Sequence, residues 1–503
     1  MLIIILGLIV VCVTLLWTYF RIKFRRMMQL ADKIPGPKPL PLIGNALEFG
    51  TNTKEIFNNV IRLSNEYEAI SRYWLGPQLC VHLTDPAYVE AILSNPKLLD
   101  KAWSYKYLKL WLGTGLLTGS GQKWKSHRKL ITPTFHFKIL ETFVDAFNSN
   151  ADILIKQLST HVNGSEFDIQ PYITMCALDN ICETAMGESV NAQEDSDSEY
   201  VKAIKSMCDS IMFRSFRPWL HADFLFEMTS AGKLQKKCLD ILHGKTKRVI
   251  ASRKKRFLET AGSRNDTFED NEGIGRHKHT AFLDLLIQSS ENGTLLTDQD
   301  IQEEVNTFMF EGHDTVAASM GFTCWSLAAY QNIQEKVMSE LKEIFGDSNR
   351  SPNIQDLQAM KYLEQVIKES LRLYPSVPLY GRQLTTDLSI GKYTLPAHTN
   401  VFILPYVMHR DPKYFPDPEK FDPDRFLPEN ILDRPPHCYV PFAAGARNCI
   451  GQKYAMLEIK VTLCQLLRNY KLLPGTTPLD ITNEIVLKST TGINIALEAR
   501  GKA

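Results

Sequence analysis

The chain has 503 residues, of which 44% are hydrophobic, 22% charged and 10% aromatic. These fractions are typical of a globular protein and exclude a disordered, collagen-like or multi-span membrane chain. Lysine and arginine together number 57, against 56 aspartates and glutamates. Because the positive excess is so small, we expect no nucleic acid partner.

The N-terminal segment predicts a membrane anchor. Residues 1–20 carry no charged side chain, and a helix of that length rises about 30 Å, enough to cross the hydrocarbon core of a membrane. Four basic residues follow within positions 21–26, which favours a cytoplasmic location for the rest of the chain. A cleaved signal peptide is the alternative, but neither basic residues before the apolar run nor a small-residue cleavage site is present.

A proline-rich stretch follows the basic residues. Residues 34–41 hold four prolines, which excludes a helix or a central strand and indicates an extended connector. We therefore divide the chain into a membrane anchor at residues 1–20, a basic and proline-rich linker at 21–45, and one large domain at 46–503.

The large domain is predicted to be mainly helical with few strands. Beyond residue 46 most hydrophobic periodicity is helical, including the long stretches 301–331 and 452–467. The polar, glycine-containing segment 259–276 predicts an exposed loop. Strands are expected at residues 69–74 and 79–83 (a hairpin), 388–404 (two short strands) and 485–497 (a hairpin turning at Gly492).

One cysteine stands out among the ten. The chain has no Cys-x-x-Cys pair, so zinc-ribbon, iron–sulfur and thioredoxin-like sites have no support. Cys449, however, ends a glycine-bearing loop just before a predicted helix. A thiol at the start of a helix is shifted towards thiolate by the helix dipole and by free backbone N–H groups. Such a thiolate is a suitable axial ligand for haem iron.

Four motifs carry a resemblance to a known family. The spacing Phe-x-x-Gly-x-Arg-x-Cys-x-Gly around Cys449 resembles the haem-binding loop of the cytochrome P450 family. The other three occur in the order of that family and are Trp124-x-x-x-Arg128, Glu369-x-x-Arg372 and Pro423-Asp424-Arg425-Phe426. The resemblance covers about residues 35 to 500. It implies the P450 fold, mainly α with a small β subdomain, preceded here by a single N-terminal transmembrane helix.

The resemblance also implies a haem b cofactor whose iron is bound by Cys449. Haem propionates need hydrogen-bond donors when they are taken out of water. The residues expected to bind the haem are Trp124, Arg128, Arg382, Phe442, Arg447, Cys449 and Gly451. Glu369 and Arg372, one helical turn apart, are expected to form a buried network with Arg425 that is structural rather than catalytic.

An acidic residue and a threonine occur in the middle of the helix predicted at 301–331. Asp314 and Thr315 are poor choices for packing alone, and a mid-helix threonine can bond the backbone and open a kink that admits water. In the resembled family this pair relays protons during oxygen activation. We therefore expect Asp314 and Thr315 to be catalytic.

Glu311 lies four residues before Thr315, on the same helical face. The string Phe-x-Phe-Glu-Gly-His-Asp-Thr at 308–315 resembles the fatty-acid ω-hydroxylase branch of the family. In that branch the corresponding glutamate can be esterified to a haem methyl group. The sequence leaves open whether Glu311 forms this ester or is a hydrogen-bonded acid.

The expected partners follow from what the chain lacks. It contains neither a Gly-x-Gly-x-x-Gly nucleotide motif nor a flavin module, so electrons must come from another protein. The resemblance implies NADPH–cytochrome P450 reductase, with cytochrome b5 as a second candidate, at the endoplasmic reticulum membrane. Residues that would form a basic face for the reductase are Lys123, Lys125, His127, Lys129 and Lys453.

The expected function is that of a haem-thiolate monooxygenase. It would insert one oxygen atom from O2 into a lipophilic substrate, a fatty acid or related lipid, at or near its terminal carbon. One alternative is a P450-fold isomerase or dehydratase of peroxides, and another is a haem carrier or sensor without turnover. Asp314 and Thr315 argue against both, because neither function needs protons delivered to dioxygen.

Overall fold

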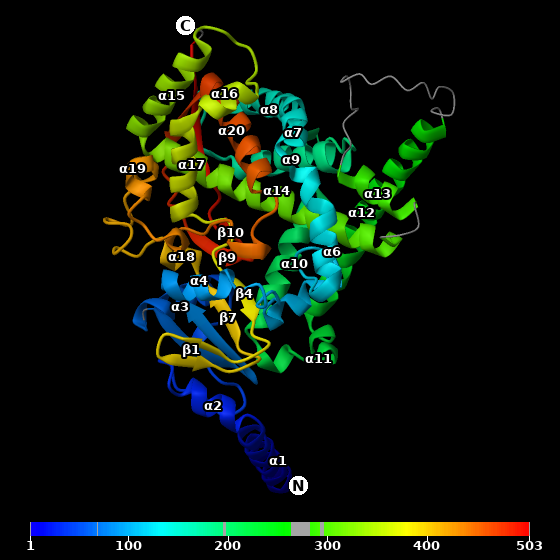
Figure 1. Ribbon diagram of the computed structural model, residues 1–503, viewed down its shortest axis with the longest axis vertical. Helices are drawn as coiled ribbons and strands as arrows, with labels where there is room; N and C mark the ends of the chain where they lie inside the picture. The colour runs from blue at the N-terminus through cyan, green and yellow to red at the C-terminus, as the bar shows by residue number, and fades with distance from the viewer. Residues whose placement is uncertain (1, 68, 195–197, 263–281, 292–295, 502–503) are drawn as a thin grey trace.

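A computed structural model describes residues 2–67, 69–194, 198–262, 282–291 and 296–501. Helix α14 (Asp298–Ala329) runs through the centre of the molecule, and most of its side chains are buried (Figure 1). It begins at a capping box formed by Thr297 and Asp300. Among the elements packed against it are α9 (Gln170–Ile181), α12 (Ser230–Gly262), α17 (Lys361–Leu373) and α20 (Gln452–Asn469).

Helices make up most of the rest of the chain, so the mainly helical class is confirmed. The helices predicted at 301–331 and 452–467 are α14 and α20. The others are α1 (Leu2–Lys23), α2 (Arg25–Ala31), α3 (Thr53–Glu66), α4 (Pro86–Leu93), α5 (Lys109–Leu112), α6 (Gly121–Ile131), α7 (Phe137–Leu140), α8 (Val144–Leu158), α10 (Glu199–Ser215), α11 (Asp223–Glu227), α13 (Phe282–Glu291), α15 (Gln331–Phe345), α16 (Ile354–Ala359), α18 (Pro405–Met408) and α19 (Pro428–Ile431).

A four-stranded sheet near the N-terminal end has the order β1-β2-β7-β4. The predicted hairpin is confirmed, since β1 (Ile70–Leu75) pairs antiparallel with β2 (Gln78–Leu83). Strand β7 (Asn400–Ile403) lies parallel to β2 and antiparallel to β4 (Tyr380–Gln383). The segment 388–404 holds three strands rather than two, because β5 (Leu388–Ile390) and β6 (Tyr393–Leu395) form their own pair.

The hairpin predicted at 485–497 is wrong. Strand β10 (Val486–Ser489) pairs antiparallel with the preceding strand, β9 (Ile481–Glu484). Strand β11 (Asn494–Ala499) pairs instead with β8 (Tyr470–Pro474) and β3 (Phe167–Asp168). The chain reverses at Ile485, whose φ is 74°. Gly492 closes no hairpin and lies between β10 and β11. A larger residue would not fit there, because a Cβ would lie 2.7 Å from the Asp168 carboxylate.

The loop predicted at 259–276 lies partly outside the described residues. Helix α12 continues to Gly262, so the first four positions of that segment are helical rather than irregular. Helix propensity overrides the polar composition there. Residues 263–276 fall outside the part of the chain that the structure describes.

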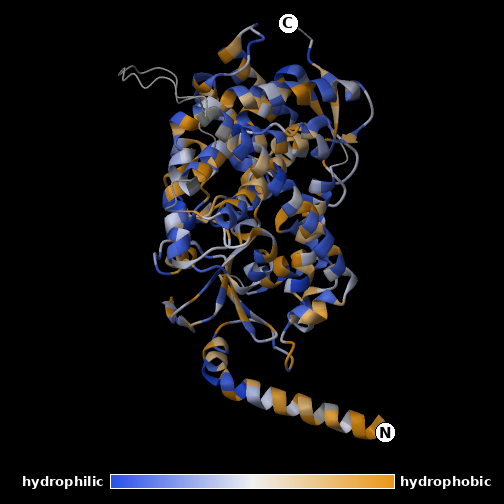
Figure 2. Cartoon of the chain, turned by 90° about the vertical axis from the view of Figure 1, so that its right-hand side faces the viewer, coloured by the Kyte–Doolittle hydropathy of each residue, from blue (hydrophilic) through white to orange (hydrophobic). Residues whose placement is uncertain are grey.

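Helices α1 and α2 project from the body of the molecule, as Figures 1 and 2 show. Most apolar side chains of α1 are exposed, Ile3 among them at 84%. The end of α1 contacts the sheet, where the Phe20 ring lies 6.0 Å from that of Trp74. Within the described residues, no helix combines the length and the apolar character needed to cross a membrane.

Candidate active site

The Cys449 loop is held at both ends by hydrogen bonds. The backbone N–H of Cys449 donates to the carbonyl oxygen of Phe442 at 2.9 Å. Arg128 of α6 donates to the backbone and side-chain oxygens of Asn448 at 2.9 and 2.8 Å. Gly445 has a φ of +71°, and a Cβ there would lie 1.9 Å from the carbonyl oxygen of Leu93. Only glycine fits this turn, which fixes the path of the loop into α20.

The protein around Cys449 determines the protonation of its thiol. Its side chain is accessible to solvent, yet the surrounding protein raises the pKa of the thiol to about 12, through burial and then through Glu311. A backbone hydrogen bond from Gly451 and the charge of Arg128 act in the opposite direction and are outweighed. The sequence argument from the helix start predicted a lowered pKa, so its direction is wrong for the protein alone. A metal ion would reverse it, because a coordinated thiol loses its proton.

Buried cations gather beside this loop. Arg447 lies with its guanidinium 4.1 Å from the centre of the Trp124 ring and donates to the carbonyl oxygen of Leu116 at 3.3 Å. Arg382 of β4 is 2% exposed and donates to the carbonyl oxygen of Gly381 at 3.2 Å. Burial and the nearby Arg382 lower the pKa of Arg447 to about 9.

Lys101 is a third cation of this group, which sequence reasoning missed. Its backbone pairs with that of Arg382, and its ammonium lies 4.8 Å from the centre of the Tyr105 ring. Burial, together with Arg382 and Arg447, lowers its pKa well below the ordinary value. We call Lys101, Arg382 and Arg447 the cation cluster.

The residues present fit a haem. Among the described residues, no carboxylate forms an ion pair with any member of the cation cluster, although buried charges are normally paired. The indole nitrogen of Trp124 and Nε of Arg447 also lack a partner in the described part of the chain. The two propionates of a haem would supply the missing acceptors. A Cβ at Gly451 would meet open space, which leaves room for a flat group beside Cys449.

Helix α14 brings Glu311 close enough to Cys449 for its charge to act on the thiol. Burial raises the pKa of Glu311 to about 7, while Lys101 opposes the rise. Thr315 donates its hydroxyl to the carbonyl oxygen of Glu311 at 2.7 Å. The backbone bond expected of this threonine is therefore present, but the helix continues through it without interruption.

Asp314 and Thr315 have different bonding partners. Its carboxylate is 4% exposed and forms an ion pair with Lys488 of β10, a residue 174 positions away in the chain. No motif in the sequence indicates Lys488, because its role depends on a strand pairing that the sequence did not predict.

The three residues expected to form a network lie together. Glu369 and Arg372 are both fully buried, and the guanidinium donates to both carboxylate oxygens at 2.7 and 2.8 Å. Arg372 also donates to the carbonyl oxygens of His409 and Lys420 at 2.8 and 3.1 Å. Arg425 lies 3.5 Å from Glu369. We call this group the Glu369 network.

Two residues of the expected basic face are bonded to acids of α14 instead. Lys123 pairs with Asp300 at 2.6 Å and with Glu303 at 2.7 Å, and His127 bonds to Glu304 at 2.6 Å. These contacts attach α6 to the start of α14, so neither side chain offers its charge to a partner. The exposed cations of that face are Lys125, Lys129 and Lys453.

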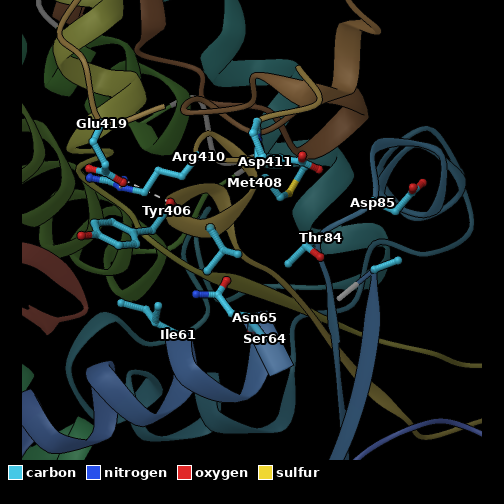
Figure 3. Close-up of a pocket in the computed structure, with 13 residues that line it drawn as sticks. Ile61, Ser64, Asn65, Thr84, Asp85, Tyr406, Met408, Arg410, Asp411 and Glu419 are labelled. Atoms are coloured by element: carbon cyan, nitrogen blue, oxygen red, sulfur yellow. Dashed lines mark hydrogen bonds and ion pairs between the residues drawn. The ribbon is translucent and has the colours of Figure 1, made fainter. Parts of the chain in front are cut away.

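A separate surface groove of about 560 Å³ lies between α3, the sheet and α18 (Figure 3). Its Arg410 bonds to Glu419 at 3.1 Å and to the carbonyl oxygen of Tyr406 at 3.1 Å. None of the residues predicted for the active site lines it. The groove is therefore distinct from the space beside Cys449.

Comparison with known proteins agrees with this geometry. The sequence profile described as Cytochrome P450 matches residues 34–495. Cytochrome P450 4c3 of Drosophila melanogaster is 42% identical, with 94% of this chain and 91% of the relative covered. Human Cytochrome P450 4V2 is 44% identical, with 95% and 92% covered, and Cytochrome P450 4c21 of Blattella germanica is 46% identical, with 89% and 88% covered. Membership implies a haem ligated by a cysteine thiolate, O2, a substrate and a reductase as electron donor. The chain belongs to the cytochrome P450 family of monooxygenases.

Proposed function

We propose that this monooxygenase inserts one oxygen atom from O2 into a fatty acid or related lipid, at or near the terminal carbon. The observation that carries the proposal is the half-buried Glu311, which lies close enough to Cys449 for its charge to act on the thiol and belongs to the segment that resembles the ω-hydroxylase branch. Phe310, the residue before Glu311, is apolar and packs its ring 4.5 Å from that of Trp111. A lipid chain suits such a lining.

The residues would divide the work as follows. Cys449 would bind the iron of haem b, which when bound supplies the centre at which O2 is activated. Asp314 and Thr315 would hold and pass protons at the carboxylate and hydroxyl oxygens, and the Glu369 network would maintain the fold around the cofactor. The residues that would hold the haem edge and propionates are Trp124, Arg128, Arg382, Phe442, Arg447 and Gly451.

Glu311 would form an ester with a haem methyl group. Glu311 would hold the haem covalently through one carboxylate oxygen and give up its carboxyl proton, and the O2-dependent chemistry of the bound haem would supply the two-electron oxidation that such an ester requires. The carboxyl then carries no charge, which removes the cost of burying it. The neutral, fixed side chain would stiffen the pocket and restrict attack to the end of the lipid chain.

We place this reaction at a membrane. We propose residues 1–20 as a single-pass anchor in the endoplasmic reticulum membrane, 21–45 as the linker and 46–503 as the cytoplasmic catalytic domain. The exposed apolar side chains of α1 and the basic residues that follow it support this arrangement. NADPH–cytochrome P450 reductase would supply electrons, with cytochrome b5 as an additional donor, at the face that exposes Lys125, Lys129 and Lys453.

Product regiochemistry tests the proposal. The protein is reconstituted with the reductase and NADPH and given fatty acids of increasing chain length under air. We expect mainly ω-hydroxylated product, and haem that stays with the polypeptide after acid–organic extraction. Glu311→Ala is the comparison, and it should release its haem and scatter hydroxylation along the chain. NADPH consumption without lipid product would reject the substrate, and turnover of a lipid hydroperoxide without NADPH would favour an isomerase.

A further inference from the structure

The β9–β10 hairpin carries a line of polar side chains towards α14. In the register of the pair, Thr482 lies opposite Lys488, and Glu484 lies two residue pairs closer to the turn and therefore on the same face. We call Thr482, Glu484 and Lys488 the hairpin polar face. Lys488 pairs with Asp314, so this face begins at the carboxylate proposed to handle protons.

The other members of this face are buried and incompletely bonded. Glu484 is 7% exposed and Thr482 is 1% exposed. Within the described residues, neither Oε2 of Glu484 nor Oγ1 of Thr482 has a hydrogen-bond partner. Buried polar atoms without a protein partner are the places where proteins hold ordered water, which conducts protons between side chains. Packing alone gives no reason for an acid at this position.

The far end of the hairpin polar face reaches the protein surface. Helix α10 packs against β9, as Figure 1 shows, and brings Asp209 and the exposed Lys205 towards Glu484. Helix α3 also packs on β9, where its Lys54 is paired with Asp480 at 2.5 Å, just before the strand. Ionisable groups therefore extend from α10 through Glu484 and Lys488 to Asp314, and of these Lys488 and Asp314 are in direct contact.

We propose that Glu484 is a positioning residue for proton supply, which passes protons from the α10 surface to Asp314 by way of Lys488 and bound water. The overall reaction requires such a route: a substrate C–H bond, O2, two electrons from the reductase and two protons give an alcohol and one water. Asp314 itself is 4% exposed and is paired with Lys488, so protons that pass through it must be replaced by way of its neighbours. The inference rests on the proposed role of Asp314 and Thr315.

The electrostatics of Glu484 suit a group that exchanges protons near neutral pH. Burial, followed by Asp209, raises its pKa to about 7, while Lys205 and Lys488 oppose the rise and Asp314 adds to it. A proton-transfer group works best when its pKa lies near the working pH.

The test is Glu484→Gln in the full-length, haem-loaded enzyme with reductase, NADPH and an accepted lipid. The amide keeps the size of the side chain but cannot release a proton at neutral pH. We expect product formation to fall about tenfold, more NADPH to end as hydrogen peroxide, and the solvent deuterium isotope effect to increase. The substrate-induced spectral shift and the haem content should stay at wild-type values, and Glu484→Asp should recover part of the rate.

Glu188→Gln is the matched control. Glu188 is 6% exposed and accepts a hydrogen bond at 2.8 Å from Ser252, a residue of α12 and not of α14. This variant should leave rate, coupling and isotope effect unchanged. An equal loss of coupling in both variants would show a general effect of losing a buried acid and would overturn the inference.

A second variant tests the direction of the route without touching Glu484. Asp209→Asn removes a negative neighbour, so Glu484 should release its proton more readily and the alkaline fall of the rate should move to lower pH. An unmoved pH profile would contradict the route. Asp314→Asn separates the two proposals: if it loses coupling while Glu484→Gln does not, only this inference fails, and if both behave as wild type, the proposed role of Asp314 fails too.

Discussion

The Glu369 network and the cation cluster are both made of buried charges, but they are completed in opposite ways. In the network, Arg372 is fully buried and donates to two carboxylate oxygens and two carbonyl oxygens of the protein. In the cluster, Arg382 is equally buried and bonds only to a carbonyl oxygen within the described chain. The network contains its own carboxylate, whereas within the described chain the cation cluster is paired with none.

This difference separates a structural group from a binding group. A charge that the chain itself neutralises holds the fold together, because nothing further is needed to compensate for its burial. A group of cations without an acid indicates a missing anionic partner, here the propionates of the haem. Both groups contain two arginines, so residue type does not distinguish their roles. The presence or absence of a carboxylate partner does.

Removing an acid from the satisfied group should have the largest effect on stability. In Glu369→Ala, Arg372 keeps its charge but loses its carboxylate in a fully buried position. We expect the free energy of unfolding to fall by about 3–5 kcal/mol. Chemical denaturation of the haem-loaded protein, followed by circular dichroism, measures this change.

Glu335→Ala is the control for this loss. Its partner is Arg500 at 3.1 Å, but the Glu335 side chain is 53% exposed. Exposed pairs contribute about 0–1 kcal/mol, so this variant should unfold almost as the wild type does. Similar losses in the two variants would show that burial does not distinguish the network from an ordinary surface pair.

The network also shows how far sequence reasoning reaches. The spacing of Glu369 and Arg372 on one helix predicted their pairing, because residues three apart face the same side of a helix. The helices at 301–331 and 452–467 and the first hairpin were equally predictable, since their signals are local. These features depend on residues close together in the chain.

Features that depend on distant residues could not be predicted. Lys488 meets Asp314 only because the chain reverses at Ile485, and the sequence suggested a reversal at Gly492 instead. Lys101 joins Arg382 through a strand contact across 281 positions, with no motif to indicate it. The pairing of Lys123 likewise depends on acids at the start of α14, which the sequence of α6 alone does not show.

Glu458 of α20 is intermediate between the Glu369 network and the cation cluster, because the protein bonds only one of its two carboxyl oxygens. It gives a pH-dependent test of the comparison. It is fully buried, accepts a hydrogen bond from Asn180 at 3.0 Å, and has one oxygen without a partner in the described chain. Burial raises its pKa to about 8, so the folded protein keeps this carboxyl protonated where the unfolded chain ionises. Its contribution to stability is therefore full below about pH 4.5 and is lost as the pH rises to about 8.

Glu458→Gln should remove that loss, because the amide keeps the shape and stays neutral. We expect the variant to match the wild type at pH 5 and to be more stable by about 2 kcal/mol at pH 9. Thermal unfolding midpoints measured across this range give the comparison. A constant difference at all pH values would mean that Glu458 does not ionise in this window.

Arg382→Met should produce the smallest effect but the sharpest contrast, because its sign depends on the ligand. Without haem, the substitution removes an uncompensated buried charge, and we expect the chain to gain about 1 kcal/mol of stability. With haem, it removes a donor to a carboxylate, and haem loss to an excess of a haem-free acceptor protein should become about tenfold faster. No variant of the Glu369 network can show this reversal, since its acids and bases are all supplied by the chain. If Arg382→Met destabilised the haem-free chain, the cation cluster would be part of the structural framework, and bonding state would not separate the two groups.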